Sequence, residues 1–135
     1  VLIVALGSLV YMAYEAAHAL GQEGIQAGVV NARFVKPLDE DLIIDLATKA
    51  QLIVTVEEGA RQGGFGSALL ELLEKKQNSF ANQIVPGVKI LAIPDHFIQH
   101  GKRDILLDSI GLSAKKIKNE VLACYQTIRQ ENLTG

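Results

Sequence analysis

Short runs of branched apolar residues alternate with amphipathic stretches along the chain, and this alternation restricts the fold more than any other feature. Four runs, at residues 1–6, 28–30, 52–56 and 88–93, have the length and composition of strands buried on both faces. Helical patterns lie between them, which requires right-handed crossovers and a mostly parallel sheet. The sequence therefore predicts an α/β fold with three layers, α/β/α, around a doubly wound sheet.

We expect these strands, numbered along the chain, to lie in the spatial order 2-1-3-4. In that order the crossovers leave in opposite directions from a switch point between the strands that end at Leu6 and Val56. Open α/β sheets bind their ligands at the carboxyl ends of the strands, beside such a point. The loops that follow the strands are therefore the candidate functional segments.

Several residues are of the types that begin or end helices. Ser8 is placed to cap the first helix, and acidic residues after Pro37 favour a second helix by matching its dipole. A third helix leads into a polar loop at 75–87. Ser113 is expected to cap the last helix, and we expect the tail after Arg129 to fray.

The composition indicates a globular chain. Its 135 residues, 49% hydrophobic and 21% charged, suffice for a single domain over 1–135. A net charge of -2 without any run of lysine or arginine argues against nucleic acid or an anionic membrane as a partner. No apolar stretch reaches the roughly 20 residues that span a bilayer, and Cys124, the only cysteine, excludes an internal disulfide. We expect a cytoplasmic location, or a plastid in a plant-type organism.

Three strands are followed by segments of unusual composition. The second strand leads into Asn31-Ala32-Arg33-Phe34-Val35-Lys36-Pro37-Leu38-Asp39, the third into Glu57-Glu58-Gly59 and Gly63-Gly64-Phe65-Gly66-Ser67, and the fourth into Pro94-Asp95-His96-Phe97-Ile98-Gln99-His100-Gly101. Loops positioned by a rigid scaffold often carry binding and catalytic residues. These segments therefore distinguish the chain from a generic α/β domain.

The turn from Gly63 to Ser67 has two interpretations. Backbone amides at a helix N-terminus bind phosphate, but no Lys-Ser or Lys-Thr pair ends this motif, so tight packing of helix on strand is favoured. Glu57 and Glu58 are neighbours in an extended strand, and their side chains point to opposite faces. One carboxylate accepting loop amides, while the other faces a partner surface, is favoured over a pair of acid–base catalysts.

The other two loops also have a structural alternative. Arg33 and Lys36 flank an aromatic residue before a proline, a pattern that either holds an acidic group across a domain boundary or is a solvated strand exit. His96 and His100 have no third ligand nearby in sequence, which disfavours a metal site, and Asp95 is expected to bond backbone amides. No nucleophile–base pairing is present. The sequence predicts shaped loops with no catalytic, cofactor-binding or metal-binding residue.

At these loops the sequence resembles the C-terminal domain of the transketolase family, and within that family most closely the 1-deoxy-D-xylulose-5-phosphate synthases. The resemblance covers residues 1–125. The Arg-Phe-Val-Lys-Pro-Leu-Asp and Glu-Glu-Gly motifs are similar to those of related thiamin-dependent subunits too, whereas the segment from Pro94 to Gly101 is similar to the synthases. Lys102 and Arg103 depart from the family, which commonly has threonine or serine after the His-Gly pair.

The resemblance implies a whole enzyme that uses thiamin diphosphate and magnesium to decarboxylate pyruvate. The two-carbon remainder is joined to glyceraldehyde 3-phosphate, for isoprenoid and thiamin synthesis. Cofactor and metal are then expected in upstream domains of the same polypeptide, and not in this chain, which begins inside a strand without methionine and is expected to be a fragment inactive alone. The upstream thiamin-binding domains and the second subunit of a homodimer are its expected partners. The candidate interdomain rim comprises Gly7, Ser8, Arg33, Lys36, Glu57, Glu58, Gly63, Gly64, Phe65, Gly66, Ser67, Asp95 and His100.

Two alternatives remain open. The same fold is implied for the β subunit of a 2-oxo-acid dehydrogenase, which would meet an acyltransferase core. An independent binding module would instead hold a phosphorylated ligand between Gly64 and Ser67. Binding to the folded state alone would raise the melting temperature of such a module.

Overall fold

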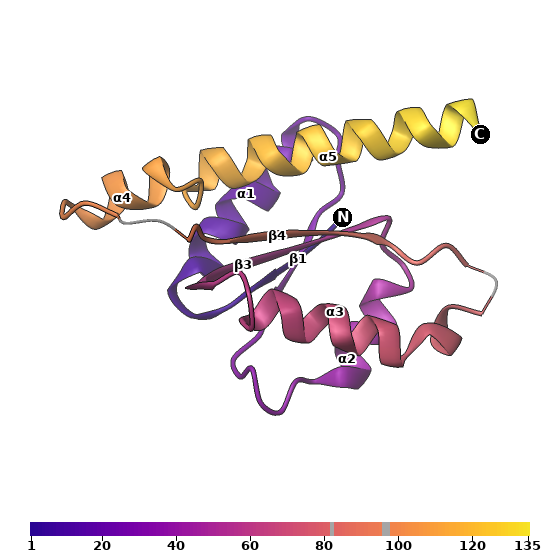
Figure 1. The fold of residues 1–135 in the computed structure, drawn as a ribbon. Helices are drawn as coiled ribbons and strands as arrows, with labels where there is room; N and C mark the ends of the chain where they lie inside the picture. The colour runs from indigo at the N-terminus through magenta and orange to yellow at the C-terminus, as the bar shows by residue number, and fades with distance from the viewer. Residues whose placement is uncertain (82, 96–97) are drawn as a thin grey trace.

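The computed structural model describes residues 1–81, 83–95 and 98–135 (Figure 1). Its sheet contains four strands in the order β2-β1-β3-β4, and every pairing between them is parallel. The predicted strand order is confirmed. The strands are β1 (Leu2–Ala5), β2 (Gly28–Asn31), β3 (Leu52–Ala60) and β4 (Gly87–Ile93).

Helices cover both faces of the sheet (Figure 1). On one face lie α1 (Val10–Gln22) and α5 (Ala114–Thr134), and on the other lie α2 (Glu40–Ala47) and α3 (Phe65–Lys75). Alternate strand residues feed two separate cores: Ile3 and Val54 pack under α1 and α5, whereas Val4 packs on the opposite side. The predicted three-layer arrangement is confirmed.

Side-chain caps begin two of these helices as the sequence indicates. The Leu42 amide donates to the Asp39 carboxylate over 3.2 Å at the start of α2, and the Lys116 amide donates to the Ser113 hydroxyl over 3.3 Å at the start of α5. Each cap satisfies a backbone donor that has no partner within its own helix. The predicted cap at Ser113 is confirmed.

Ser8 does not cap the first helix, and that prediction is wrong. Gly7–Leu9 forms a 3-10 turn (η1), and Leu9 precedes α1 without any side-chain hydrogen bond. Gly7 has a φ of 65°, a left-handed conformation that glycine adopts without a Cβ clash. The Ser8 hydroxyl instead contacts Glu58.

Three further segments are more ordered than expected. The polar loop at 75–87 contains a 3-10 turn, η2 (Gln77–Phe80), because the Phe80 side chain, only 1% exposed, enters the core beside α3. The last helix continues to Thr134, past the expected fraying point. An additional helix, α4 (Arg103–Ser109), buries Leu107, and its seven residues are too few for a helical period to stand out in the sequence. Among the described residues, no helix combines the length and apolar character needed to cross a membrane.

Candidate functional site

The strands all end at one edge of the sheet, on the left in Figure 1, where α4 also lies. The switch point at this edge separates β1, which leads toward β2, from β3, which leads toward β4. β3 extends beyond its expected end at Val56 and carries Glu57 and Glu58 to this point within the strand itself. Because successive side chains of a strand alternate, the two carboxylates point to opposite faces of the sheet.

Glu57 points to the α3 face and is 2% exposed. Its carboxylate accepts hydrogen bonds from the amides of Phe65 over 2.8 Å and Gly66 over 2.9 Å. These amides belong to the first turn of α3, where a negative charge is also favoured by the helix dipole. Gly64, the residue that precedes the helix, has no side chain to act as a cap. Glu57 therefore caps α3 from the end of β3, which confirms the prediction that one carboxylate accepts loop amides.

The glycines around the Glu57 carboxylate lie where a larger side chain would clash with neighbouring atoms. A Cβ on Gly64 would lie 2.2 Å from the Ala60 carbonyl oxygen and 2.7 Å from a carboxylate oxygen of Glu57. A Cβ on Gly59 would lie 2.9 Å from the same carboxylate, which its two hydrogen bonds hold in place. On the other side, a Cβ on Gly66 would lie 2.8 Å from the Ile90 side chain. The glycine-rich motif thus allows close packing of α3 on β3 and β4 around a buried charge.

This arrangement contradicts the hypothesis of a phosphate site between Gly64 and Ser67. The amides of Phe65 and Gly66, which would have to bind the anion, already donate to the protein's own carboxylate. Ser67 is also engaged, since its hydroxyl donates to the Arg61 carbonyl over 3.0 Å and accepts from the Gly63 amide over 3.2 Å. The packing interpretation is the correct one.

Glu58 lies on the opposite side of β3, where it links three segments. The Ser8 hydroxyl donates to one carboxylate oxygen over 3.3 Å, and Nη2 of Arg103 donates to the other. The same Nη2 donates to the Ser8 hydroxyl over 2.7 Å. Both charged side chains are partly exposed, so this network at the rim joins the ends of β1 and β3 to α4 without burying a charge.

Arg103 is the member of this network that was not predicted as a site residue. Its only signal in the sequence is a departure from the family, a Lys-Arg pair where threonine or serine is common. The structure shows the consequence at the start of α4, where Lys102 gives no side-chain cap. The guanidinium of Arg103 attaches that helix to Glu58 instead.

The remaining predicted residues lie apart from these two carboxylates. Arg33 and Lys36 are exposed in the loop after β2, which is one outer strand of the sheet. Asp95 and His100 are exposed after β4, which is the other outer strand. No hydrogen bond or ion pair within the described part of the chain involves any of the four side chains. His96, the proposed neighbour of His100, lies outside the described residues.

Two observations bear on whether thiamin diphosphate or its metal ion could bind to the described residues. The N-terminus of α3, which follows the glycine-rich turn, is occupied by Glu57. Nor do His, Cys, Asp and Glu side chains gather anywhere in 1–81, 83–95 and 98–135 in a group of three that could hold a metal ion. No chemical step is therefore assigned to that cofactor within this chain.

Comparison with known proteins finds a matching family, similar sequences and similar solved structures. Residues 1–117 match the family model for the transketolase C-terminal domain. The chain is 50% identical to the 1-deoxy-D-xylulose-5-phosphate synthase of Heliobacterium modesticaldum over 117 residues, which are 87% of this chain and 17% of that protein. It is 45% identical to the Aquifex aeolicus synthase over 119 residues, 88% of this chain and 18% of that one. A solved structure described as a split gene transketolase, inactive beta4 tetramer, aligns with a TM-score of 0.78 and 34% identity, over 90% of this chain and 38% of that chain. The chain thus spans less than a fifth of the length of these two synthases.

Proposed function

The chain belongs to the transketolase C-terminal domain family, and from that premise we propose that it is the C-terminal domain of a 1-deoxy-D-xylulose-5-phosphate synthase. The identities of 50% and 45% to two synthases support the choice of enzyme. The whole enzyme would use thiamin diphosphate and magnesium to release carbon dioxide from pyruvate. It would then join the two-carbon fragment to glyceraldehyde 3-phosphate.

Within that enzyme the domain would have an architectural role. The observation that carries this proposal is the environment of Glu57. Its side chain is buried, and its two carboxylate oxygens accept hydrogen bonds from backbone amides of the same domain. A general acid or base must reach the proton that it transfers. The Glu57 carboxylate, buried and bonded to two amides, has a structural role instead. Glu58, the other carboxylate at the switch point, is held by Ser8 and Arg103.

The rim residues would instead contact the thiamin-binding domains of the same polypeptide and help to hold a homodimer. Gly7, Ser8 and Glu58 are exposed at the switch point, where ligands and partners of open α/β sheets bind. The similar split gene transketolase is described as a tetramer of its beta chain, inactive in that form. That description supports a part in subunit contacts for chains that contain this domain.

The test is an assay of the intact polypeptide and of the 135-residue chain side by side. Both receive pyruvate, glyceraldehyde 3-phosphate, thiamin diphosphate and magnesium, and carbon dioxide and deoxyxylulose phosphate are measured. We expect activity in the intact polypeptide alone. Activity in the 135-residue chain would refute the architectural role, and an intact, cofactor-bound polypeptide without activity would refute the choice of enzyme.

A further inference from the structure

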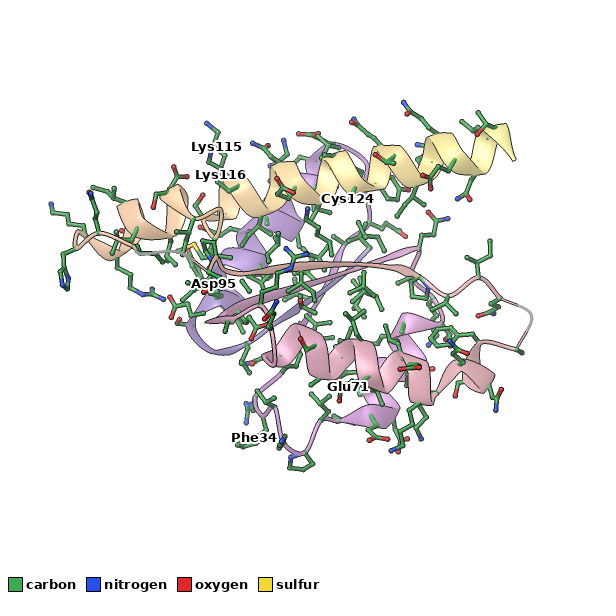
Figure 2. All side chains as sticks on the ribbon, in the orientation of Figure 1. Phe34, Glu71, Asp95, Lys115, Lys116 and Cys124 are labelled. Carbon is green, nitrogen blue, oxygen red and sulfur yellow. The ribbon has the colours of Figure 1, made fainter. Side chains whose placement is uncertain are left out.

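The loop that joins β2 to α2 exposes an aromatic side chain between two cations. Phe34 is 68% exposed, and Leu42, on the first turns of α2, is 45% exposed. Figure 2 shows Phe34 projecting away from the body of the domain on the α2 side of the sheet. Arg33 and Lys36 lie on either side of it and are also exposed.

Neither cation forms a side-chain hydrogen bond or an ion pair within residues 1–81, 83–95 and 98–135. Three acidic residues lie at the start of α2: Asp39 accepts the Leu42 amide, Glu40 pairs with Lys75 and Lys76, and Asp41 is in no ion pair of the described residues. Among the ion pairs of the described residues, none includes Arg33 or Lys36. These two positive charges are therefore without an ion-pair partner among the described residues.

A small pocket lies beside these residues. It has a volume of about 200 Å³, and its lining includes the apolar Phe34, Pro37, Leu42 and buried Ile43 together with the charged Arg33 and Asp39. Pockets that enclose drug-sized ligands have roughly 300 to 1,000 Å³, so this one is of the size for a single apolar side chain. Aromatic residues and arginine are also the types that dominate the energy of protein interfaces.

We propose that Arg33, Phe34, Lys36 and Leu42 form a docking surface for an acidic segment of another domain of the same polypeptide, with one apolar side chain of that segment in the pocket. This inference rests on the proposed function, because it assumes that further domains adjoin this one. Charge complementarity selects the acidic partner, since the Arg33 guanidinium matches a carboxylate in a bidentate geometry.

The small size of the surface selects a tethered partner over a separate chain. Stable contacts between separate chains bury more than about 1,000 Å² in total, whereas one pocket and two cations offer far less. A segment of the same polypeptide is present at a high effective concentration, so a few contacts suffice to dock it. The second subunit is thereby the less favoured source.

Zero-length carbodiimide cross-linking of the intact polypeptide tests this surface. Lys36 is expected to link to an aspartate or glutamate outside residues 1–135, within one polypeptide, as judged from mixed isotopically labelled subunits. Lys115 and Lys116 serve as controls, because they are exposed lysines on α5, in the layer across the sheet (Figure 2). The proposal is overturned if Lys36 links no more often than these lysines, or links only to the second subunit.

Matched variants provide a second readout. R33Q/K36Q in the intact polypeptide should speed proteolysis between the domains by about tenfold, which corresponds to about 1.4 kcal/mol of lost docking free energy, and F34A should act in the same direction. K115Q/K116Q should leave the rate unchanged. Equal rates in all variants would contradict the surface even if the wild type is an active synthase. A faster rate in R33Q/K36Q and F34A would support it even if synthase activity is absent.

Discussion

Glu57→Ala should be among the most damaging single substitutions in this domain. It removes two charge-assisted hydrogen bonds, worth about 1.5–3 kcal/mol each, together with a favourable helix-dipole interaction of up to about 2 kcal/mol. Relief from burying a carboxylate offsets part of this loss. A buried donor left without an acceptor costs about 1–3 kcal/mol, and we expect a net loss of about 3–5 kcal/mol here because the amides of Phe65 and Gly66 both lose their acceptor.

Glu57→Gln removes the charge of the side chain but keeps its shape, so it measures the contribution of the charge and of its second acceptor oxygen. Glutamine keeps one carbonyl acceptor but directs an N–H group at the second amide, so a loss of about 1.5–3 kcal/mol is expected. Glu58→Gln is the matched control, because Glu58 is the adjacent residue in β3 and its ion pair with Arg103 is partly exposed. We expect that control to lose less than about 1 kcal/mol.

Urea denaturation followed by circular dichroism gives these free energies, provided that the slope with denaturant stays constant across the variants. Hydrogen exchange at the Phe65 and Gly66 amides gives a local readout, since both should exchange faster in Glu57→Ala and keep wild-type rates in Glu58→Gln. The reasoning is refuted if Glu57→Ala and Glu58→Gln lose the same free energy, or if the two amides exchange equally in all three proteins.

Four further substitutions test other parts of the structure by the same denaturation assay. Gly64→Ala should lose about 3 kcal/mol or more, as its Cβ would overlap the Ala60 carbonyl; wild-type stability would show that this turn can relax. Phe80→Ala should lose about 3–5 kcal/mol, because it empties a core position beside α3, and a loss under about 1 kcal/mol would mean that η2 does not pack there in solution. Thr55→Val should gain about 1 kcal/mol, since the Thr55 hydroxyl, 0% exposed, has no hydrogen-bond partner among the described residues; a loss instead would indicate an ordered water bound to it. Ser113→Ala should lose about 1 kcal/mol through its cap on α5, and an unchanged midpoint would argue against that cap.

The strand order and the layers could be predicted because the central strands β1 and β3 are apolar on both faces. Ile3 and Val54 on one face, with Val4 on the other, make the runs apolar on both sides, and short crossovers between such runs leave few topologies. The opposite directions of the Glu57 and Glu58 side chains followed from the pleat alone. These features depend on local pattern and on general rules of chain connection.

What the sequence did not reveal depends on contacts between distant segments. Arg103 reaches Glu58 across 45 positions of the chain, and Ser8 joins them from the end of β1. Phe80 is one aromatic residue in a polar stretch, and only the space beside α3 shows that it is buried. The predicted cap at Ser8 was wrong because its hydroxyl bonds to Glu58 and Arg103, which are distant in the sequence.

The central claim, that this domain supports the enzyme without contributing to its chemistry, is tested most directly by the kcat of Glu57→Gln and Glu58→Gln in the intact, cofactor-loaded polypeptide. The rate is taken per folded molecule, at a temperature where each variant is fully folded. We predict wild-type kcat for both variants, with lower stability for Glu57→Gln alone. General acid–base groups contribute roughly 10²- to 10⁴-fold to rate, so a fall of that size in either folded variant would contradict the account.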